Sequence, residues 1–303
     1  MAEKSGDHIL LGLIFLSSAS EQGNALLKRL ASEFSNIQGL EIGSNWEELD
    51  GGELAFQLRR YSHIVMILDE RSPGSRWLSY LAGYAMGNRS VLLFYRESEK
   101  KFPHYLNTFP VYGDAPALMD ALHEEVERHQ IYCRVEEARE ELIGRGFGLN
   151  DQVFVDAVAD NRRDVVELFL TVGFSPDTCD SKDVALLNHA VRGGHDDIIV
   201  LLLENGADPN AVSGDRGNTP VMDAASTGQT ELVRLLLAAG ADPDVQSKSG
   251  QTGLMMAVGE GFAQISSLFI EAGCDLSVTD QLGMTAEKYA RLFNSPEIVS
   301  LFE

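Results

Sequence analysis

Basic side chains are scarce in this chain of 303 residues. Its 24 Lys and Arg stand against 46 Asp and Glu, a formal net charge of −22. The shortage is greatest over residues 147–303, where 9 basic residues face 24 acidic ones, a net charge of −15. Proteins neutralise the phosphates of nucleic acid with clustered Lys and Arg, so this composition argues against nucleic acid as a ligand. We interpret the excess acid mainly as a source of solubility, and a basic protein partner is the alternative.

Cysteine and long apolar runs are scarce too. The three cysteines, Cys133, Cys179 and Cys274, show no metal-ligand spacing, and their odd number argues against a disulfide framework. This predicts a reduced, cytoplasmic setting. The apolar run over residues 9–16 is too short to span a membrane, and the acidic leader before it differs from the positively charged start of a signal peptide. No glycine cluster forms a phosphate-binding loop. From these patterns together we expect no membrane segment, no metal and no cofactor.

One segment is present four times in the second half of the chain, at intervals of 33 or 34 residues. Its copies end in turns that begin at Gly173, Gly206, Gly240 and Gly273 and read G-F-S-P-D, G-A-D-P-N, G-A-D-P-D and G-C-D-L-S. A period of this length predicts stacked supersecondary units rather than one globular core. Such stacks mostly bind other macromolecules.

The third copy shows the unit most clearly. Thr219 and Pro220 suit the start of a first helix, and Gly228 suits its end. A second helix is expected over residues 231–239, with its leucines on one face. The period and the T-P…G-A-D pattern resemble the ankyrin repeat. The resemblance covers residues 147–303 and implies an all-α solenoid of about four repeats plus a C-terminal cap.

Ankyrin-type solenoids are expected to present a concave surface made of loop tips and first-helix residues. Aligning the copies gives one outward first-helix position per repeat, a second position one turn later, and the loop tips. Met256 and Tyr289 are the expected anchors, because large apolar and aromatic groups carry most interface energy. The predicted partner-binding residues are Met256, Tyr289, Asp223, His189, Arg192, Thr227, Glu260, Arg216 and Lys248.

The first 130 residues alternate short apolar runs with helical patterns. Strands are predicted over residues 9–16, 40–42, 64–68, 91–95 and 109–112, and helices over 21–34, 54–60, 76–87 and 115–128. This alternation predicts an α/β domain, a small parallel sheet with helices on both faces. A ligand crevice is then expected beyond the carboxyl ends of the strands. Residues 131–146 predict a short charged helix that connects this domain stiffly to the repeats.

The stretch from Ser62 to Ala85 reads S-H-I-V-M-I-L-D-E-R-S-P-G-S-R-W-L-S-Y-L-A-G-Y-A. It resembles the Toll/interleukin-1 receptor (TIR) domain and is similar to nucleoside 2-deoxyribosyltransferases, which share a flavodoxin-like layout. Enzymes of both kinds place a glutamate in the helix, where it acts on the ribose. Both patterns put Leu81 at that position, and a leucine has no lone pair to attack C1′. Asp69 and Glu70, after the third predicted strand, are the candidates for a substitute carboxylate.

Three functions are compatible with these patterns. The leading hypothesis is a non-enzymatic scaffold or adaptor that binds a protein partner through an acidic concave face. The second is an enzyme or sensor that acts on NAD or a nucleoside in the N-terminal crevice. The third is a TIR-like adaptor whose N-terminal domain self-associates while the repeats recruit a client protein.

Overall fold

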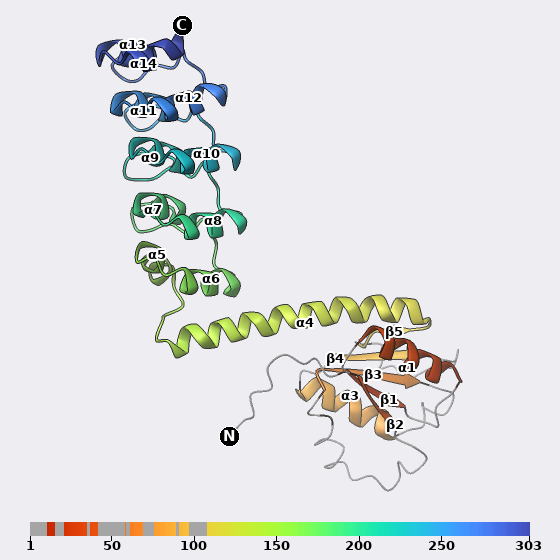
Figure 1. Cartoon of the computed structure of the whole chain (residues 1–303). Coiled ribbons are helices and arrows are strands. Elements are labelled where there is room, and N and C mark those ends of the chain that lie inside the picture. The colour runs from red at the N-terminus through yellow and green to blue at the C-terminus, as the bar shows by residue number, and fades with distance from the viewer. Residues whose placement is uncertain are drawn as a thin grey trace. The chain divides into compact units, whose positions relative to one another are not determined.

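A computed structural model describes residues 11–15, 21–34, 37–41, 58, 61–68, 76–88, 91–96 and 108–303. The chain forms two compact units, Met1–Tyr132 and Cys133–Glu303, drawn as ribbons in Figure 1. Each unit is described by itself below.

The first unit contains a parallel sheet. Its strands are β1 (Leu11–Phe15), β2 (Ile37–Glu41), β3 (His63–Leu68), β4 (Val91–Arg96) and β5 (Val111–Tyr112), in the order β2-β1-β3-β4-β5. All four pairings are parallel; for example, Val65 of β3 lies opposite Leu93 of β4. Strands β3 and β4 are almost continuously apolar because helices cover both faces of a parallel sheet. The prediction of a small parallel sheet is confirmed.

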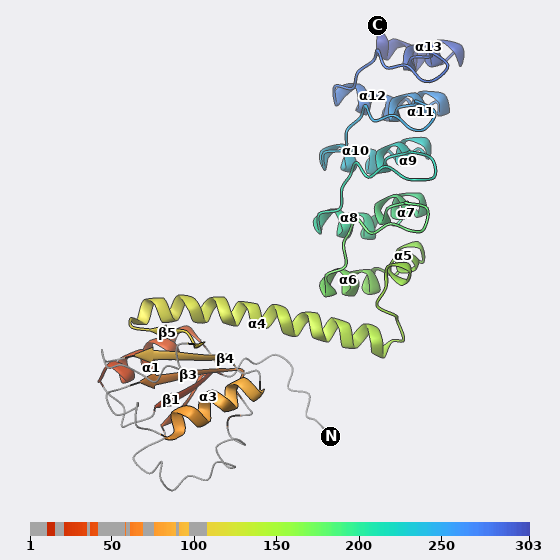
Figure 2. The ribbon, with the colours of Figure 1, turned by 180° about the vertical axis from the view of Figure 1, so that it is seen from behind.

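Alternate side chains of β3 enter two separate apolar clusters. Ile64 and Met66 pack with residues of α3 (Arg76–Asn88) on one face of the sheet. Val65 and Ile67 pack on the other face with residues of α1 (Glu21–Glu33) and the first turns of α4 (Ala115–Gly144). Figures 1 and 2 show these helices around the sheet from opposite sides. The period of two along the strand thus builds both cores.

Helix α4 corrects the predicted break between residues 128 and 131. It runs without interruption from Ala115 to Gly144 and ends where the next glycines begin. No Gly or Pro interrupts it after its first turn, and Arg128 bonds to Glu124 at 3.1 Å and to Glu125 at 2.5 Å on the same face. Strand β2 also begins three residues earlier than expected. Of the predicted helix over 54–60, only Leu58 is among the described residues.

The second unit is a stack of helix pairs. The pairs are α5 (Asp151–Ala159) with α6 (Arg163–Val172), α7 (Leu186–Gly193) with α8 (Asp196–Glu204), α9 (Pro220–Ser226) with α10 (Thr230–Ala238), α11 (Gly253–Glu260) with α12 (Ala263–Glu271), and α13 (Ala286–Leu292) with the short α14 (Pro296–Val299). One apolar core runs through the whole stack. Each first helix has a buried alanine at the same position of the repeat, namely Ala157, Ala190, Ala224, Ala257 and Ala290. These small residues let neighbouring helices approach closely.

Side chains of one turn bind the backbone of the next turn. The glycines that begin the turns are left-handed caps, as predicted; Gly240, for instance, has φ +94°. In each joint a side-chain oxygen accepts the N–H of the acidic residue one repeat later: Asp177 from Asp208 (2.7 Å), Asn210 from Asp242 (2.7 Å), and Asp244 from Asp275 (2.8 Å). Much of the acid in these turns therefore has a structural role between repeats.

Candidate protein-binding groove

A groove of about 370 Å³ opens beside the first helices of the last three repeats. Its apolar lining comes from Met255 and Met256 of α11, Tyr289 of α13, and Phe293 at the end of α13, and Arg216 and Glu260 add opposite charges. We call this feature the α9–α13 groove. Its volume lies within the range typical of small-ligand sites.

The aromatic part of the groove is held in place. The hydroxyl of Tyr289 donates to Oδ2 of Asp280 at 2.6 Å, and its ring stacks on Phe293 with centroids 6.0 Å apart and planes 7° apart. Asp280 is itself fixed, because its Oδ1 accepts the N–H groups of Leu282 and Met284 at 2.9 Å each. The bond to Asp280 and burial together raise the pKa of Tyr289. Phe293 nevertheless remains 53% exposed, so a rigid aromatic surface faces solvent.

In the second repeat, His189 occupies the position of Tyr289 and makes the equivalent contact to a loop aspartate. Nε2 of His189 lies 3.0 Å from Oδ2 of Asp180, the residue equivalent to Asp280. Oδ1 of Asp180 again accepts two backbone N–H groups of its loop. Burial opposes ionisation of Asp180, but those N–H groups and His189 outweigh it and lower its pKa. His189 therefore supports its own loop and lies outside the α9–α13 groove.

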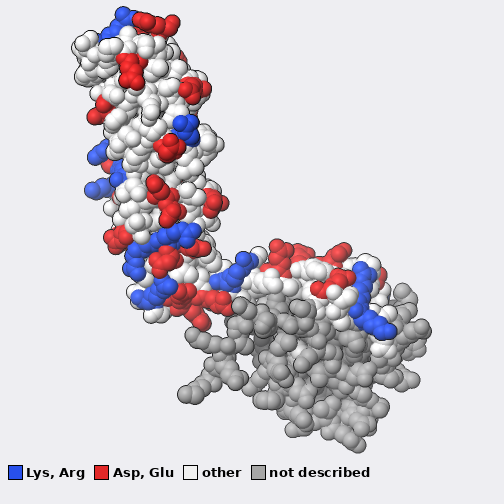
Figure 3. Space-filling view, in the orientation of Figure 1, with Lys and Arg blue, Asp and Glu red and all other residues white. Residues whose placement is uncertain are grey.

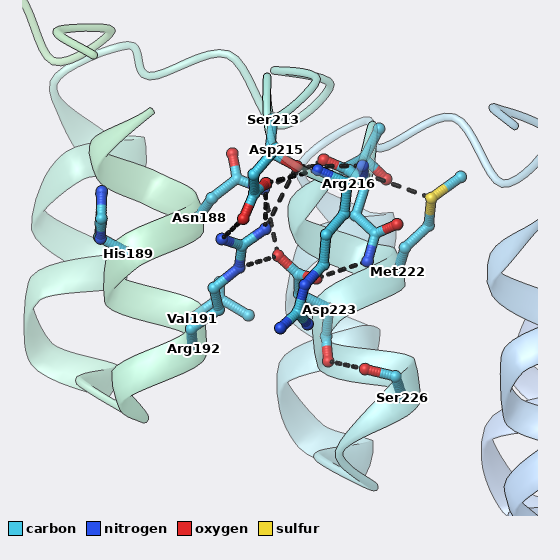
Figure 4. Close-up of polar contacts among 12 residues, drawn as sticks. Asn188, His189, Val191, Arg192, Ser213, Asp215, Arg216, Met222, Asp223 and Ser226 are labelled. Carbon is cyan, nitrogen blue, oxygen red and sulfur yellow. Dashed lines mark hydrogen bonds and ion pairs between the residues drawn. The ribbon is translucent and has the colours of Figure 1, made fainter. Parts of the chain in front are cut away.

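Asp223 corrects the prediction of an outward, exposed position. Its side chain is only 3% exposed and forms the centre of a polar network between the second and third repeats (Figure 4). Nε of Arg192 on α7 donates to Oδ2 of Asp223 at 2.7 Å, and Nδ2 of Asn218 donates to Oδ1 at 2.8 Å. Nη1 of Arg192 donates to Oδ2 of Asp215 at 2.8 Å. Arg192 and Asp223 thus join two repeats rather than face a partner.

The network also sets the ionisation of its outer members. The bonds from Arg192 outweigh burial and hold the pKa of Asp215 well below its usual range. Burial by itself would lower the pKa of Arg192, but its bonds to Asp215 and Asp223 raise it instead. The guanidinium and the Asp215 carboxylate are therefore a stable ion pair at neutral pH.

The remaining predicted contacts are divided between the groove and internal roles. Thr227 donates to the carbonyl oxygen of Asp223 at 2.9 Å, and Lys248 donates through Nζ to the carbonyl oxygens of the preceding loop, that of Gly214 among them. Arg216 and Glu260 are exposed and make no ion pair with any residue that the structure describes.

Four of the nine predicted residues therefore meet at one groove: Arg216, Met256, Glu260 and Tyr289. The sequence reasoning missed Met255 and Phe293. Phe293 follows Tyr289 by four residues, the spacing of neighbours on one helix face, so this signal was present.

The described residues of the first unit do not bring its candidate residues together in a site. Leu81 is 1% exposed and packs in the core between α3 and the sheet. His63, at the start of β3, is fully buried against His129 with ring centroids 5.1 Å apart, and burial first, then His129, lowers its pKa to about 4. Asp69 and Glu70 lie outside the described residues. Within the described segments, no cluster of His, Cys, Asp and Glu could hold a metal ion.

Comparison with known proteins agrees with the stacked helix pairs. A family model for ankyrin repeats (3 copies) matches residues 154–247 and 221–302. A putative ankyrin repeat-containing protein of Treponema pallidum (strain Nichols) is 34% identical over 223 residues, which cover 73% of this chain and 75% of the relative. The chain belongs to the ankyrin-repeat proteins. The Treponema match is longer than residues 147–303 alone, so it includes part of the first 146 residues.

Other relatives match this ankyrin-repeat protein over short segments. The palmitoyltransferase Hip14 of Drosophila melanogaster is 40% identical over 78 residues, 26% of this chain and 12% of the relative. The 2-5A-dependent ribonuclease of Mus musculus is 41% identical over 71 residues, 23% of this chain and 10% of the relative. This chain thus spans only a small part of those proteins. Among the described helices, none has the length and apolar character needed to cross a membrane.

Proposed function

We propose that this ankyrin-repeat protein is a non-enzymatic scaffold or adaptor that binds a protein partner through its first-helix face. The observation that carries the proposal is the α9–α13 groove, where a fixed aromatic pair leaves Phe293 53% exposed beside Met256. Aromatic and large apolar side chains in preformed hollows dominate the free energy of protein association. A fixed ring also loses little side-chain entropy when a partner binds.

Capture of partners by matched variants tests this proposal. Full-length protein, Phe293→Asp and Leu292→Asp would each be used to isolate proteins from the source cells, with quantitative mass spectrometry. Leu292 is the control, because it is adjacent, 66% exposed and does not line the groove. We expect Phe293→Asp to lose specific partners by at least about tenfold while Leu292→Asp retains them. Equal capture by all three proteins would show that the groove is not the binding surface.

We further propose that the first unit is a flavodoxin-like, TIR-like domain without catalytic activity, and that it mediates self-association. The parallel strand order β2-β1-β3-β4-β5 supports the fold assignment, because it is a common doubly-wound order. The burial of Leu81 supports the loss of activity, since this position offers no group to a ligand. Boundaries near residues 130 and 147 and a cytoplasmic location belong to the same proposal. Light scattering over a range of concentrations tests self-association, and a monomer throughout would contradict it.

The alternative is an N-glycosidic enzyme or nucleotide sensor that uses NAD or a nucleoside. Incubation of the purified chain with NAD and with deoxynucleosides, followed by chromatography of the products, distinguishes the two. Turnover that is abolished by Asp69→Asn or Glu70→Gln would replace the scaffold proposal for this unit. Absence of turnover and of saturable NAD binding would remove the alternative.

A further inference from the structure

Three acidic residues near the α9–α13 groove are already engaged within the protein. Asp223 is buried under Arg192, and Asp280 accepts the hydroxyl of Tyr289. Glu287 pairs with Arg291 at 2.7 Å on α13. On the face drawn in Figure 3, red and blue side chains are interspersed along the repeats rather than gathered in one acidic patch. The net charge of the repeats is therefore a poor guide to the charge that a ligand meets at this groove.

The cations of the two loop tips at the groove, unlike these acids, are not neutralised by described ion pairs. Arg216 lines it, is exposed, and makes no ion pair with any described residue. Lys248 follows on the next loop tip, and its backbone N–H donates to the carbonyl of Arg216 at 3.1 Å, so the two loop tips are adjacent. The Nζ of Lys248 binds backbone carbonyls, which are neutral, so its charge is not cancelled. Asp215 and Asp223 are paired with Arg192, so Arg216 in the lining and Lys248 beside it are two cations that no described ion pair neutralises.

Glu260 supplies the opposite charge at another part of the lining. It lies four residues after Met256 on α11, is exposed, and has no ion pair among the described residues. The groove therefore has an apolar centre, a cationic loop side and one carboxylate on the helix side. A guanidinium binds a carboxylate through two parallel hydrogen bonds, which gives Arg216 a geometric preference as well as a charge preference.

We propose that the occupant of the α9–α13 groove is an extended segment of a partner protein that carries an acidic residue next to a large apolar one. The acidic side chain pairs with Arg216, and the apolar side chain enters between Met256 and Phe293. Glu260 repels a second acid beyond the apolar residue and so favours one direction of the segment. This inference rests on the proposed function and specifies the chemistry of its partner; a basic partner is the opposite outcome.

Selection from a random-peptide library displayed on phage tests the proposal on the full-length chain. Wild type, Arg216→Glu, Arg234→Glu and Phe293→Asp would be selected in parallel. Peptides enriched on wild type would be synthesised and titrated by fluorescence anisotropy against these proteins and against Arg216→Lys. Arg234→Glu makes the same charge change on α10, where Arg234 is 59% exposed and does not line the groove. Thermal unfolding followed by circular dichroism would confirm that each variant is folded.

We expect wild type to enrich peptides with Asp or Glu beside Leu, Met, Phe or Trp. Their affinity should fall at least tenfold with Arg216→Glu, should stay within about twofold with Arg234→Glu, and should largely recover with Arg216→Lys. Enriched peptides that depend on Phe293 but carry no acid, or carry Lys and Arg, would overturn this inference and leave the proposed function intact. Enrichment that is insensitive to Phe293→Asp, or no enrichment at all, would contradict both.

Discussion

Replacement of Arg192 by methionine should destabilise the contact between the second and third repeats by more than the loss of an exposed ion pair would. The change keeps the aliphatic stem and removes the guanidinium from Asp223, whose side chain is 3% exposed, and from Asp215. Removal of one partner of a buried ion pair costs about 3–5 kcal/mol, because the other charge stays buried without compensation.

Two features of the site reduce this cost. Arg192 is 25% exposed and Asp215 is 30% exposed, so water screens their pair. Asn218 continues to donate to Asp223 at 2.8 Å after the substitution. We therefore expect Arg192→Met to lower the free energy of unfolding of the repeats by about 2–3 kcal/mol. Each repeat contacts only its neighbours, so the protection of backbone amides from hydrogen exchange should fall mainly in α7 and α9.

Urea unfolding followed by circular dichroism measures the total loss, and hydrogen exchange with mass spectrometry locates it. Arg163→Met is the matched control, because its pair with Glu167 at 3.2 Å is 51% and 56% exposed and should contribute less than about 1 kcal/mol. A second change, Asp223→Asn, removes the buried charge and should restore about 1 kcal/mol to Arg192→Met. Equal losses in Arg192→Met and Arg163→Met, or no rescue by Asp223→Asn, would refute the assigned role of the network.

Three further predictions concern packing, thiol reactivity and pH. Gly214→Ala should lower the free energy of unfolding of the repeats by about 1–3 kcal/mol in urea, since its Cβ would lie 2.2 Å from the carbonyl oxygen of Lys182. Gly259→Ala is the control: its Cβ would meet nothing within 4 Å, so the change should be neutral or stabilising. Burial, with Asp244 next, raises the pKa of Cys274 to about 11, so iodoacetamide at pH 8 should modify this thiol more slowly than an unfolded-chain control; equal rates would contradict its burial. The pKa of His63 is lowered to about 4 from 6.5 by burial, so its contribution is fully present above pH 6.5 and is lost as the pH falls towards 4. The first unit should lose about 2 kcal/mol between pH 7 and 5 in hydrogen exchange of β3, and a His63→Gln variant that shows the same loss would exclude His63 as its source.

The regular features of the fold were predictable because each depends on local sequence. Gly240 follows an amphipathic helix and precedes Ala-Asp-Pro, so a left-handed cap was the only simple solution. The unbroken apolar run of β3 likewise required burial on both faces, and the structure places alternate residues in two cores. Leu81, at the position where the resembling enzymes place a glutamate, is buried in the core of the first unit.

The errors came from long-range contacts and from overreading polarity. Asp223 occupies an outward position in the repeat alignment, yet Arg192 of the preceding repeat covers it, and spacing within one repeat cannot reveal a partner 31 residues away. Two helices, over 115–128 and 131–146, were expected where one continuous helix runs, and no helix-breaking residue lies between them. The acid of the turns was interpreted as solvated surface, whereas Asp177 and Asp244 accept backbone hydrogen bonds from the following repeat.

Those turn bonds make whole repeats interchangeable in one respect. Excision of residues 207–240 would place Asp242 where Asp208 stood, and Asp177 would find the same backbone N–H in the same type of turn. Gene recombination that adds or removes a unit thus recreates this joint without new side chains. The same excision would leave Arg192 opposite Met256, a thioether in place of a carboxylate. The turns permit repeats to be shuffled, and the Arg192–Asp223 contact fixes the order of two of them.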